Sequence, residues 1–415
     1  MFRSADRSAP HHRFTRMVGR DPGQAHRAAT PLELLFDLTF VVAFSQAGSQ
    51  MAHLLAEGCV AAGVAGFGFA VFAICWAWIN YSWFASAYDN DDVFFRVATM
   101  VVMLGVLLLA LGIPVAFHSI AEGHHLDIRI VVAGYVVMRV ANLTLWLRAA
   151  GHDAQRRRAC LTYAAATSVA QLGWVAVLLV DPPLSTVWIV YPVLVAIELA
   201  GPVLAERRDG GTPWHPHHIA ERYGLLVIIT LGEVVLGTIT AISAVVEVQG
   251  WTVEAVLVAV SGTALVFGLW WVYFTVPSAE VLARHRGRAF PWGYLHILIF
   301  GALAATGAGL HVAANVIDHR ALIDDPTFAV LATAIPVLVF IAVLFVVYSL
   351  LMVRIDPVQL LFFLGSAGAL AGAVAISCRG ASIGVSLLIV AASPLVVIVG
   401  YETVGYRRQA AALAD

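Results

Sequence analysis

The sequence predicts an all-α fold, a polytopic transmembrane helix bundle of about 12 spans arranged as two parallel six-helix repeats. The overall composition, the number of long apolar runs and the uneven placement of arginine lead to this prediction. Of the 415 residues, 60% are hydrophobic and 12% are charged, and the mean hydropathy is +0.86. Soluble chains are about half apolar and about a quarter charged. The composition therefore excludes a water-soluble globular enzyme.

Long apolar runs define the expected spans. A bilayer core of ~30 Å requires about 20 apolar residues per helix. Most of the runs are apolar all round, as expected for helices that face lipid or packed neighbours. The twelve runs cover residues 32–53, 60–84, 93–117, 128–148, 159–180, 185–204, 219–243, 252–276, 291–315, 327–350, 358–377 and 382–404.

Arginine is concentrated on one side of these spans. The chain has no Lys, so its 24 basic residues are all Arg. Twenty of them fall in the two terminal segments or in alternate loops, whereas three (Arg129, Arg320 and Arg379) fall on the opposite side and Arg139 lies inside the fourth run. By the positive-inside rule, we expect a multi-pass protein of the plasma or inner membrane with both termini in the cytoplasm.

The chain ends differ from the spans in composition. Residues 1–30 contain six Arg and no long apolar stretch. No short apolar region with a small-residue cleavage site follows, so this segment is not a cleavable signal peptide. We expect a disordered basic cytoplasmic tail over 1–30, a first six-helix repeat over 31–206, a second over 207–405 and a cytoplasmic C-terminal tail over 406–415.

The two expected repeats share several positions. Glu33 and Glu221 each precede a long apolar run, at an offset of 188 residues. At an offset of 192, Trp78 and Tyr81 near the end of the second run match Trp270 and Tyr273 near the end of the eighth. Units of six helices would have the same topology, and transporters often place their site between such repeats. Alternatively, these aromatic clusters are interfacial belts, which membrane helices use anyway.

Three ordered blocks carry a family resemblance. They are ATPLELLFDLTFVVAFSQ (29–46), YDNDDVFFR (88–96), which contains Asp89, Asp91 and Asp92, and ERYGLLVIITLGE (221–233), which begins with Glu221 and Arg222. The chain resembles the bacterial low temperature requirement A (LtrA) family over about residues 29–405, although Asn90 stands where that family often has Thr. The resemblance implies an integral membrane protein linked by name to growth in the cold, with no settled substrate, reaction or catalytic residue.

Two acids lie near the start of the first span. Thr30, Pro31 and Glu33 form the pattern of a capping box with proline at the first helical position. Asp37 lies roughly 10 Å from the helix start, beyond the reach of a cap. With Glu33 on the same face, Asp37 could hold a cation or share a proton. Alternatively, an Arg from another helix could pair with Asp37.

Further ionisable groups reach mid-membrane depth, where each costs about 2.5–3.5 kcal/mol on insertion scales. Glu233 lies roughly 21 Å along its helix, and Arg139 and Glu198 reach a similar depth. An Arg139–carboxylate pair would leave Glu198 or Glu233 uncompensated, which would suit proton coupling. His296 is a candidate for a proton relay or an interhelical hydrogen bond.

The loops do not predict a metal or cofactor. Asp89, Asp91 and Asp92 precede Arg96 and lack the Gly and distal Glu of a calcium loop, so we interpret them as a charged turn. The loop histidines are interpreted as solvated, and Glu221 as neutralised by Arg222 beside it. The four Cys show no Cys-x-x-Cys pattern.

Transport or ion permeation is the leading hypothesis, with Asp37, Glu233, Arg139 and Glu198 lining or gating a polar path between the repeats. One alternative is an intramembrane enzyme that acts on a lipid or lipid-linked group through Glu33, Asp37 and Asp89, and another is a sensor or scaffold without a substrate. The sequence has no Walker, Gly-x-Ser-x-Gly or His-Glu-x-x-His motif. The expected partners are the lipid bilayer and a small ion or solute, because a net charge of −2 gives no field for nucleic acid.

Overall fold

The computed structural model describes residues 14–24 and 27–414, and within them it contains helices, turns and loops but no β-strand. Twelve of its helices are long and apolar enough to cross a membrane. They coincide with the twelve runs expected from hydropathy. The prediction of an all-α polytopic bundle is therefore confirmed, while the two-repeat arrangement stays a prediction.

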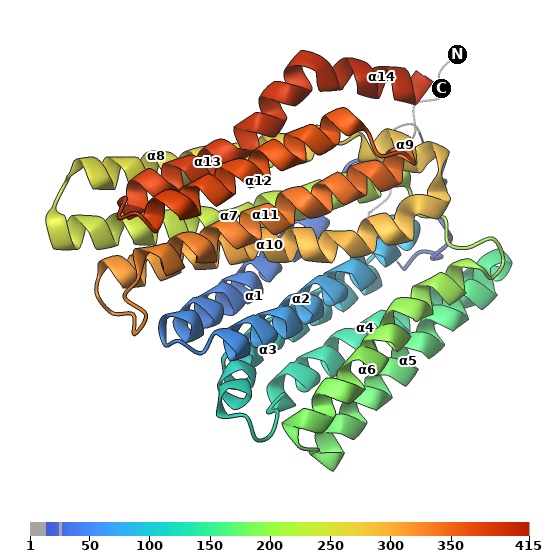
Figure 1. Cartoon of the computed structure of the whole chain (residues 1–415). Helices are drawn as coiled ribbons and strands as arrows, with labels where there is room; N and C mark the ends of the chain where they lie inside the picture. The colour runs from blue at the N-terminus through green and yellow to red at the C-terminus, as the bar shows by residue number, and fades with distance from the viewer. Residues whose placement is uncertain (1–13, 25–26, 415) are drawn as a thin grey trace.

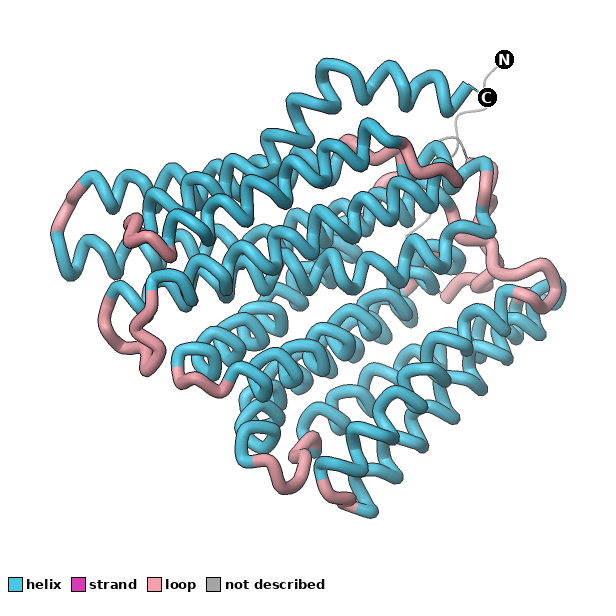
Figure 2. Tube along the Cα trace, viewed as in Figure 1, coloured by secondary structure: helices cyan, strands magenta, loops and turns pink. Residues whose placement is uncertain are grey.

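The helices alternate in direction and are joined by short loops (Figures 1 and 2). Those of the first half are α1 (Pro31–Ala56), α2 (Val60–Tyr88), α3 (Val93–Glu122), α4 (Arg129–His152), α5 (Arg157–Val180) and α6 (Leu184–Glu206). Those of the second half are α7 (Pro216–Gln249), α8 (Val253–Phe274), α10 (Ala289–Ile317), α11 (Pro326–Met352), α12 (Pro357–Ser377) and α13 (Ile383–Gly400). Hydropathy did not predict the short elements η1 (Ala154–Arg156), α9 (Ser278–Arg284), η2 (Arg286–Arg288), η3 (Tyr401–Gly405) and α14 (Tyr406–Ala414).

Side-chain caps fix where many of these helices begin. Thr30 accepts a hydrogen bond from the Glu33 amide and the Glu33 carboxylate accepts one from the Thr30 amide, so the expected capping box of α1 is present. Asp92 caps α3 in the same way through the amide of Phe95. Proline at the first helical position also starts α7, α11 and α12, where the missing N–H costs no hydrogen bond.

Helix α10 lies in the middle of the bundle, between α7 and α11, and α1 packs against both α7 and α10. Small residues allow these close approaches. A β-carbon on Gly307 of α10 would lie 2.4 Å from the Glu233 carbonyl oxygen of α7, and one on Gly309 would lie 2.3 Å from the carbonyl oxygen of Ala332 in α11. In Figure 1, α4–α6 form one edge of the bundle and α8, α12 and α13 form the other.

The described part of the N-terminal segment packs against one end of the bundle. The amide of Thr15 donates to Asp92, the amide of Met17 donates to His152, and Met17 is fully buried. These contacts involve residues 14–24 of the segment expected as a tail, and residues 1–13 lie outside the described chain, so the disordered tail stays a prediction. We call this end, which holds the arginine-rich loops, the Arg-rich end.

Candidate functional site

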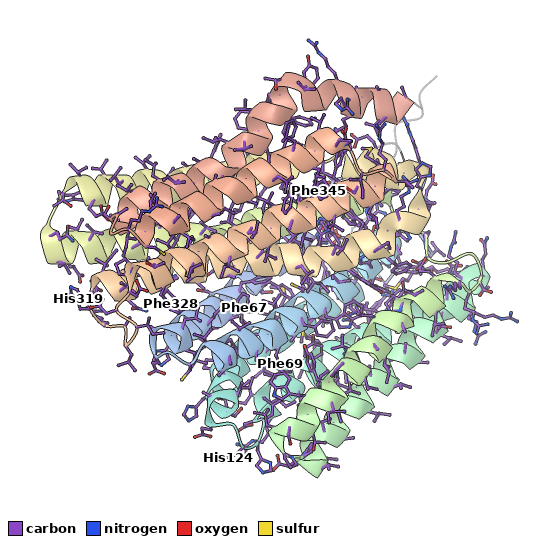
Figure 3. The ribbon with its side chains drawn as sticks, viewed as in Figure 1. Phe67, Phe69, His124, His319, Phe328 and Phe345 are labelled. Carbon is purple, nitrogen blue, oxygen red and sulfur yellow. The ribbon has the colours of Figure 1, made fainter. Side chains whose placement is uncertain are left out.

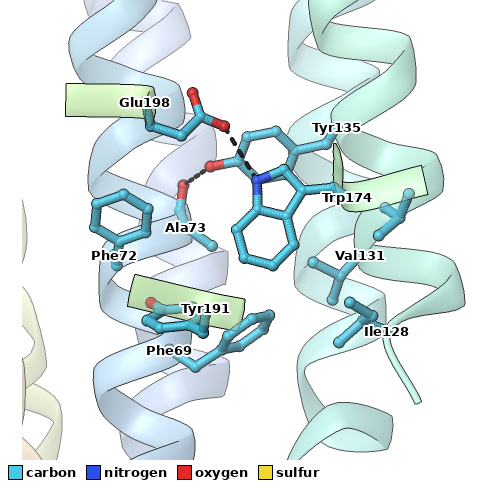
Figure 4. A pocket seen from close by; sticks show the side chains of 10 residues that line it. Phe69, Phe72, Ala73, Ile128, Val131, Tyr135, Trp174, Tyr191 and Glu198 are labelled. Atoms are coloured by element: carbon cyan, nitrogen blue, oxygen red, sulfur yellow. Dashed lines mark hydrogen bonds between the residues drawn. The ribbon is translucent and has the colours of Figure 1, made fainter. Parts of the chain in front are cut away.

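An aromatic cavity opens between α2 and the α4–α6 edge, towards the end opposite the Arg-rich end (Figure 4). About 380 Å³ of space lies between its lining atoms, part of it open to the outside, and the space free for a guest is about 30 Å³, enough for one or two waters. Four helices and the residue before α4 contribute its lining: Phe69, Phe72, Ala73, Ile128, Val131, Val132, Tyr135, Trp174, Tyr191 and Glu198. Glu198 is the one acid in this aromatic and aliphatic wall.

The Glu198 carboxylate is held by donors from three helices. Arg139 of α4 forms an ion pair with it, and both side chains are more than nine-tenths buried. The indole N–H of Trp76 in α2 donates to Oε2 at 2.8 Å, and that of Trp174 in α5 donates to Oε1 at 3.1 Å. A buried charge requires this kind of paired and hydrogen-bonded surrounding. Glu198 therefore joins α6 to α2, α4 and α5 at one point.

Two further cavities continue along the same seam. The amide cavity, of about 310 Å³, is lined by Ala77, Asn80, Tyr135, Met138, Arg139, Asn142, Trp146 and Thr167. The Tyr163 cavity, of about 330 Å³, lies closer to the Arg-rich end and is lined by Ile79, Asn80, Trp83, Tyr163, Pro202, Tyr223, Ala289, Phe290, Gly293 and Tyr294. Tyr135 lines the first two cavities and Asn80 the last two, so each cavity is adjacent to the next.

The Arg139–Glu198 pair separates the aromatic cavity from the amide cavity. Glu198 lines the former and Arg139 lines the latter. The Tyr135 ring, shared by both, lies 5.0 Å from the Arg139 guanidinium carbon. In the amide cavity the buried Oδ1 of Asn142 has no hydrogen-bond partner among the described residues. The amide cavity therefore offers a free acceptor beside a guanidinium.

A second charged cluster joins α1 to α7. Arg222 of α7 lies with Nη1 2.8 Å from Glu33 Oε1, and its Nη2 donates to Asp37 Oδ1 at 2.5 Å. Its Nε also donates to Asp37 Oδ2 at 3.2 Å, and the indole N–H of Trp78 donates to Asp37 Oδ1 at 2.7 Å. All four side chains are fully buried. Of the two interpretations given for Asp37, the structure shows pairing with an Arg from another helix.

Histidine and a loop arginine complete this cluster. His218 Nε2 lies 3.1 Å from Glu33 Oε1, and Arg27 Nη2 lies 3.9 Å from the same oxygen. Arg222 thus faces Glu33 and Asp37 across the helix interface rather than its sequence neighbour Glu221, which is exposed and accepts from the Ala29 amide at 3.4 Å. The interpretation that Arg222 neutralises Glu221 was wrong, because α7 turns the guanidinium towards α1.

Glu233 has no such partner. It is 3% exposed, its Oε1 has no hydrogen-bond partner in the described chain, and no arginine or histidine lies within salt-bridge distance among the residues described. Ser45 of α1 is the polar side chain beside it. A β-carbon on Gly48 would lie 3.6 Å from Glu233 Oε2. Because Arg139 pairs with Glu198, Glu233 is the mid-membrane acid left uncompensated.

The two tyrosines that the sequence comparison aligned each form a hydrogen bond to the following span. Tyr81 bonds to Thr99 of α3 through its hydroxyl at 2.8 Å, and Tyr273 bonds to His296 of α10 at 3.1 Å. His296 also lies 2.7 Å from the Trp292 carbonyl oxygen through Nδ1 and is fully buried. His296 therefore forms an interhelical hydrogen bond with Tyr273. Trp270, by contrast, is 38% exposed on the outside of α8.

The acidic turn at the Arg-rich end contacts other segments. Asp91 pairs with Arg96 at 2.7 Å, and Asp92 pairs with Arg148 of α4. Asp89 is 3% exposed, and its carboxylate accepts from the Asp91 amide at 2.8 Å. Burial, together with the negative charge of Glu33, raises the pKa of Asp89 to about 6. The turn thus joins α3 to α4 through Asp92 and holds Asp89 where its ionised form is disfavoured.

The histidine-bearing loops remain apart from one another. Figure 3 shows His124 and His319 at the ends of different helix pairs. His125 lies 3.2 Å from Asp181 and His319 lies 3.0 Å from Asp324, both at exposed positions. No group of three or more His, Cys, Asp or Glu side chains in the described chain could hold a metal ion.

Sequence reasoning did not select Trp76, Trp174, Tyr135 and Asn142 as site residues. Aromatic residues are common in membrane helices, so their number in α2 did not stand out. A usable signal was present, however. A tryptophan pointing inwards requires an acceptor for its N–H, and Glu198 is the acid available at that depth in the first half.

The fold and these buried pairs define a multi-pass α-helical membrane protein. The chain belongs to the bacterial low temperature requirement A (LtrA) protein family, whose model matches residues 28–394. It is also similar to the uncharacterized protein RA0937 of Rhizobium meliloti (strain 1021), with 26% identity over 293 residues, or 67% of each chain. No solved structure matches this chain.

Proposed function

We propose that this protein transports a small solute or ion along the seam between α2 and the α4–α6 edge. The observation that supports this function is the succession of three adjacent cavities, with the Arg139–Glu198 pair near mid-membrane depth between the first two. Charged groups at this depth often mark the pathway of an ion or substrate. In this proposal the pair and the Tyr135 ring are the barrier.

The path of this proposal differs from the one first expected between the repeats. Glu33 and Asp37 are engaged by Arg222 and line none of the three cavities. We propose that their cluster is structural and holds α1 to α7. The same engagement argues against their action on a lipid headgroup, because neither carboxylate is exposed.

Glu233 lines none of the three cavities, and it is proposed as a group that couples transport to a proton from outside the path. Its carboxylate lacks a cationic partner at a depth where ionisation is costly, so a proton can neutralise it. The Glu233→Gln variant should lose the dependence of flux on a pH gradient. Glu247→Gln, which changes an exposed acid on the same helix, should retain that dependence.

Blocking the seam tests the transport proposal. The protein would be reconstituted into liposomes, and fluxes of protons, rubidium and labelled small organic cations and anions would be compared with those of empty liposomes. Thr167→Phe fills the amide cavity, so the flux of the transported species should fall at least tenfold. Thr240→Phe, on an exposed face of α7, is the matched control. Rates equal to empty liposomes throughout, or an undiminished flux in Thr167→Phe, would contradict the proposal.

For orientation, we propose the plasma membrane with both termini in the cytoplasm, based on the arginine distribution. A reporter that is active only in the cytoplasm should therefore work when fused after residue 415 and fail when inserted into the loop around Gly123. The reverse pattern would overturn this orientation.

A further inference from the structure

We infer that the groove between α7 and α8 is a binding site for the acyl chains of a membrane lipid. This site lies apart from the α2–α6 seam and does not depend on the proposed transport. The inference rests on the free space between the two helices, on the composition of the groove wall and on its position in the membrane.

The groove has far more free space than the cavities of the seam. About 760 Å³ is free for a guest, and the groove is open on its outer side. Its wall consists of four residues of α7 between Val235 and Ile242 and six residues of α8 between Ala259 and Phe267. A guest much larger than water can therefore enter without displacing a side chain.

Glycine contacts with other helices explain why α7 and α8 separate here. A β-carbon on Gly237 of α7 would lie 2.5 Å from the Gly307 carbonyl oxygen of α10, and one on Gly268 of α8 would lie 3.0 Å from Pro394 of α13. Each helix thus packs closely against a different neighbour, and α8 lies at the edge of the bundle (Figure 1). Protein side chains consequently do not fill the space between them.

The groove wall is suited to hydrocarbon. Eight of its ten side chains are Val, Ile, Ala or Phe, two are Thr, and none is charged. The Thr238 hydroxyl already donates to the Val234 carbonyl at 2.6 Å, so it requires no partner from a guest. A polar guest would lose its hydration here without gaining hydrogen bonds. An acyl chain loses none and supplies the dispersion contacts that the wall otherwise lacks.

The position of the groove identifies the source of the chain. Val235 and Ile242 are seven residues apart, so the groove extends roughly 10 Å along α7, within one half of a hydrocarbon core of ~30 Å. It lies towards the end of α7 at Gln249, opposite the Arg-rich end. Ile239 and Phe267 at its rim are 55% and 58% exposed. The groove is therefore continuous with the lipid-facing surface, and lipid of that leaflet reaches it directly.

A helix from a second copy of the chain fits this groove less well. Transmembrane helices that associate closely present small residues at their contact. The rim here instead carries the exposed side chains of Val235, Ile239, Val260 and Phe267. A helix of about 10–12 Å diameter would rest on these side chains, whereas a flexible chain can follow the space between them.

Photo-cross-linking in vesicles tests the site. The protein would be reconstituted into phosphatidylcholine vesicles in which a small fraction of the lipid carries a diazirine in one acyl chain, and cross-linked residues would be mapped by mass spectrometry. The yield on residues 235–242 and 259–267 should be at least fivefold higher than on Leu172 and Leu179, which are exposed on α5. Equal yields on all lipid-facing helices would overturn the inference.

Filling the groove assigns the cross-links to it. Ala264→Phe places a ring in the groove and should lower the yield on residues 235–242 at least fivefold. Ala259→Phe should do the same from a second position, so the test stands if one variant fails to fold. Ala165→Phe, at an exposed position of α5, is the control and should leave the yield unchanged. An undiminished yield in a folded groove variant would contradict the inferred site.

Oxidative cross-linking distinguishes a lipid from a second copy. In a variant without the four native cysteines, Ile239→Cys should remain monomeric in oxidised vesicles, because lipid covers the groove. Disulfide-linked dimers as the main product would show a helix contact there and overturn the inference. Neither cross-linking experiment depends on flux through the seam, so the transport proposal and this inference fail separately.

Discussion

The two edges of the bundle, α4–α6 on one side and α8, α12 and α13 on the other, are built differently. At one edge α13 packs closely along α8, whereas at the other α6 makes few close backbone approaches to α2. In the most apolar stretch of α6, 22% of the residues are buried, against 61% in the last span. The α2–α6 seam contains the three cavities described above, and a further cavity of about 450 Å³ lies among α8, α11, α12 and α13. The two edges therefore differ in how closely their helices approach, and not in whether they contain space.

One residue in each half illustrates this difference. The offset of 192 that relates Trp78 to Trp270 also relates Trp76 to Gly268. A β-carbon on Gly268 would lie 3.0 Å from Pro394, so glycine lets α8 and α13 approach closely. In the first half, the Trp76 indole occupies this space and donates to Glu198. A hydrogen-bonded tryptophan side chain therefore lies between α2 and α6, whereas a glycine allows direct helix contact between α8 and α13.

Removing the charge that joins the two halves should have the largest effect. Arg222→Met leaves Asp37 buried without a cationic partner and Glu33 with His218 and Arg27 alone, and breaking a buried pair costs about 3–5 kcal/mol. We expect little folded protein by size-exclusion chromatography in detergent. Arg96→Met removes an exposed pair with Asp91, which water and salt screen so that it contributes little to stability, and this variant should fold normally. Equal yields for both variants would contradict a structural role of the Arg222 cluster.

Adding volume to each edge compares the two directly. Gly268→Leu forces side-chain atoms into Pro394, and overpacking of this kind costs about 1–3 kcal/mol. Ala73→Val extends into the aromatic cavity, where space is present, and should cost less than about 1 kcal/mol. Thermal unfolding followed by fluorescence measures both. A larger loss from Ala73→Val than from Gly268→Leu would show that the seam is the tighter edge.

Weakening the tryptophan contact should affect the seam alone. Trp76→Phe removes one hydrogen bond to a buried carboxylate, worth about 1.5–3 kcal/mol when the partner is charged. The retained ring offsets part of this loss, so we expect a net destabilisation of about 1 kcal/mol and a changed flux. Trp251→Phe, at a position that is 79% exposed, is the control. Identical flux in the two variants would remove Trp76 from the barrier.

The smallest expected effect concerns pH at the Arg-rich end. The pKa of Asp89 is raised to about 6, above its ordinary value near 3.9. The folded state therefore binds the proton more tightly, and this stabilisation is present below about pH 4 and lost as the pH rises through about 6.

Asp89→Asn tests this sign. The variant should be more stable than the parent at pH 7.5, by on the order of 1 kcal/mol, and should show a flatter dependence of melting temperature between pH 4.5 and 6.5. Asp21→Asn, at an exposed position of the same end, should leave that dependence unchanged. The expected direction would be contradicted if the stability of the parent protein rose between pH 4.5 and 6.5 while that of Asp89→Asn did not.

Hydropathy predicted the spans, because lipid thickness sets helix length regardless of tertiary contacts. The capping box of Thr30 and Glu33 was predictable for a similar reason, since its partners are three residues apart. Contacts between residues far apart in the sequence were not predictable. Arg222 lies 185 residues from Asp37, and only the packing of α7 against α1 brings them together.

The Arg139–Glu198 pair was foreseen only as one of two possibilities. Depth alone could not decide whether Arg139 pairs with Glu198 or Glu233, because both acids lie near the same level. The packing of α6 beside α4 and α5 decides it, and the two indole N–H groups reinforce it. The cavities could not be predicted, since they result from how bulky side chains fill the space between helices.

Thiol labelling tests the central claim most directly. In a variant without the four native cysteines, Ala73→Cys in the aromatic cavity and Leu265→Cys in α8 place single thiols that are both buried, with Leu265 2% exposed. A small water-soluble methanethiosulfonate should modify residue 73 at least tenfold faster than residue 265. Equal rates at both positions, or an unreactive residue 73 in protein that is folded and active, would contradict a water-accessible path along the α2–α6 seam.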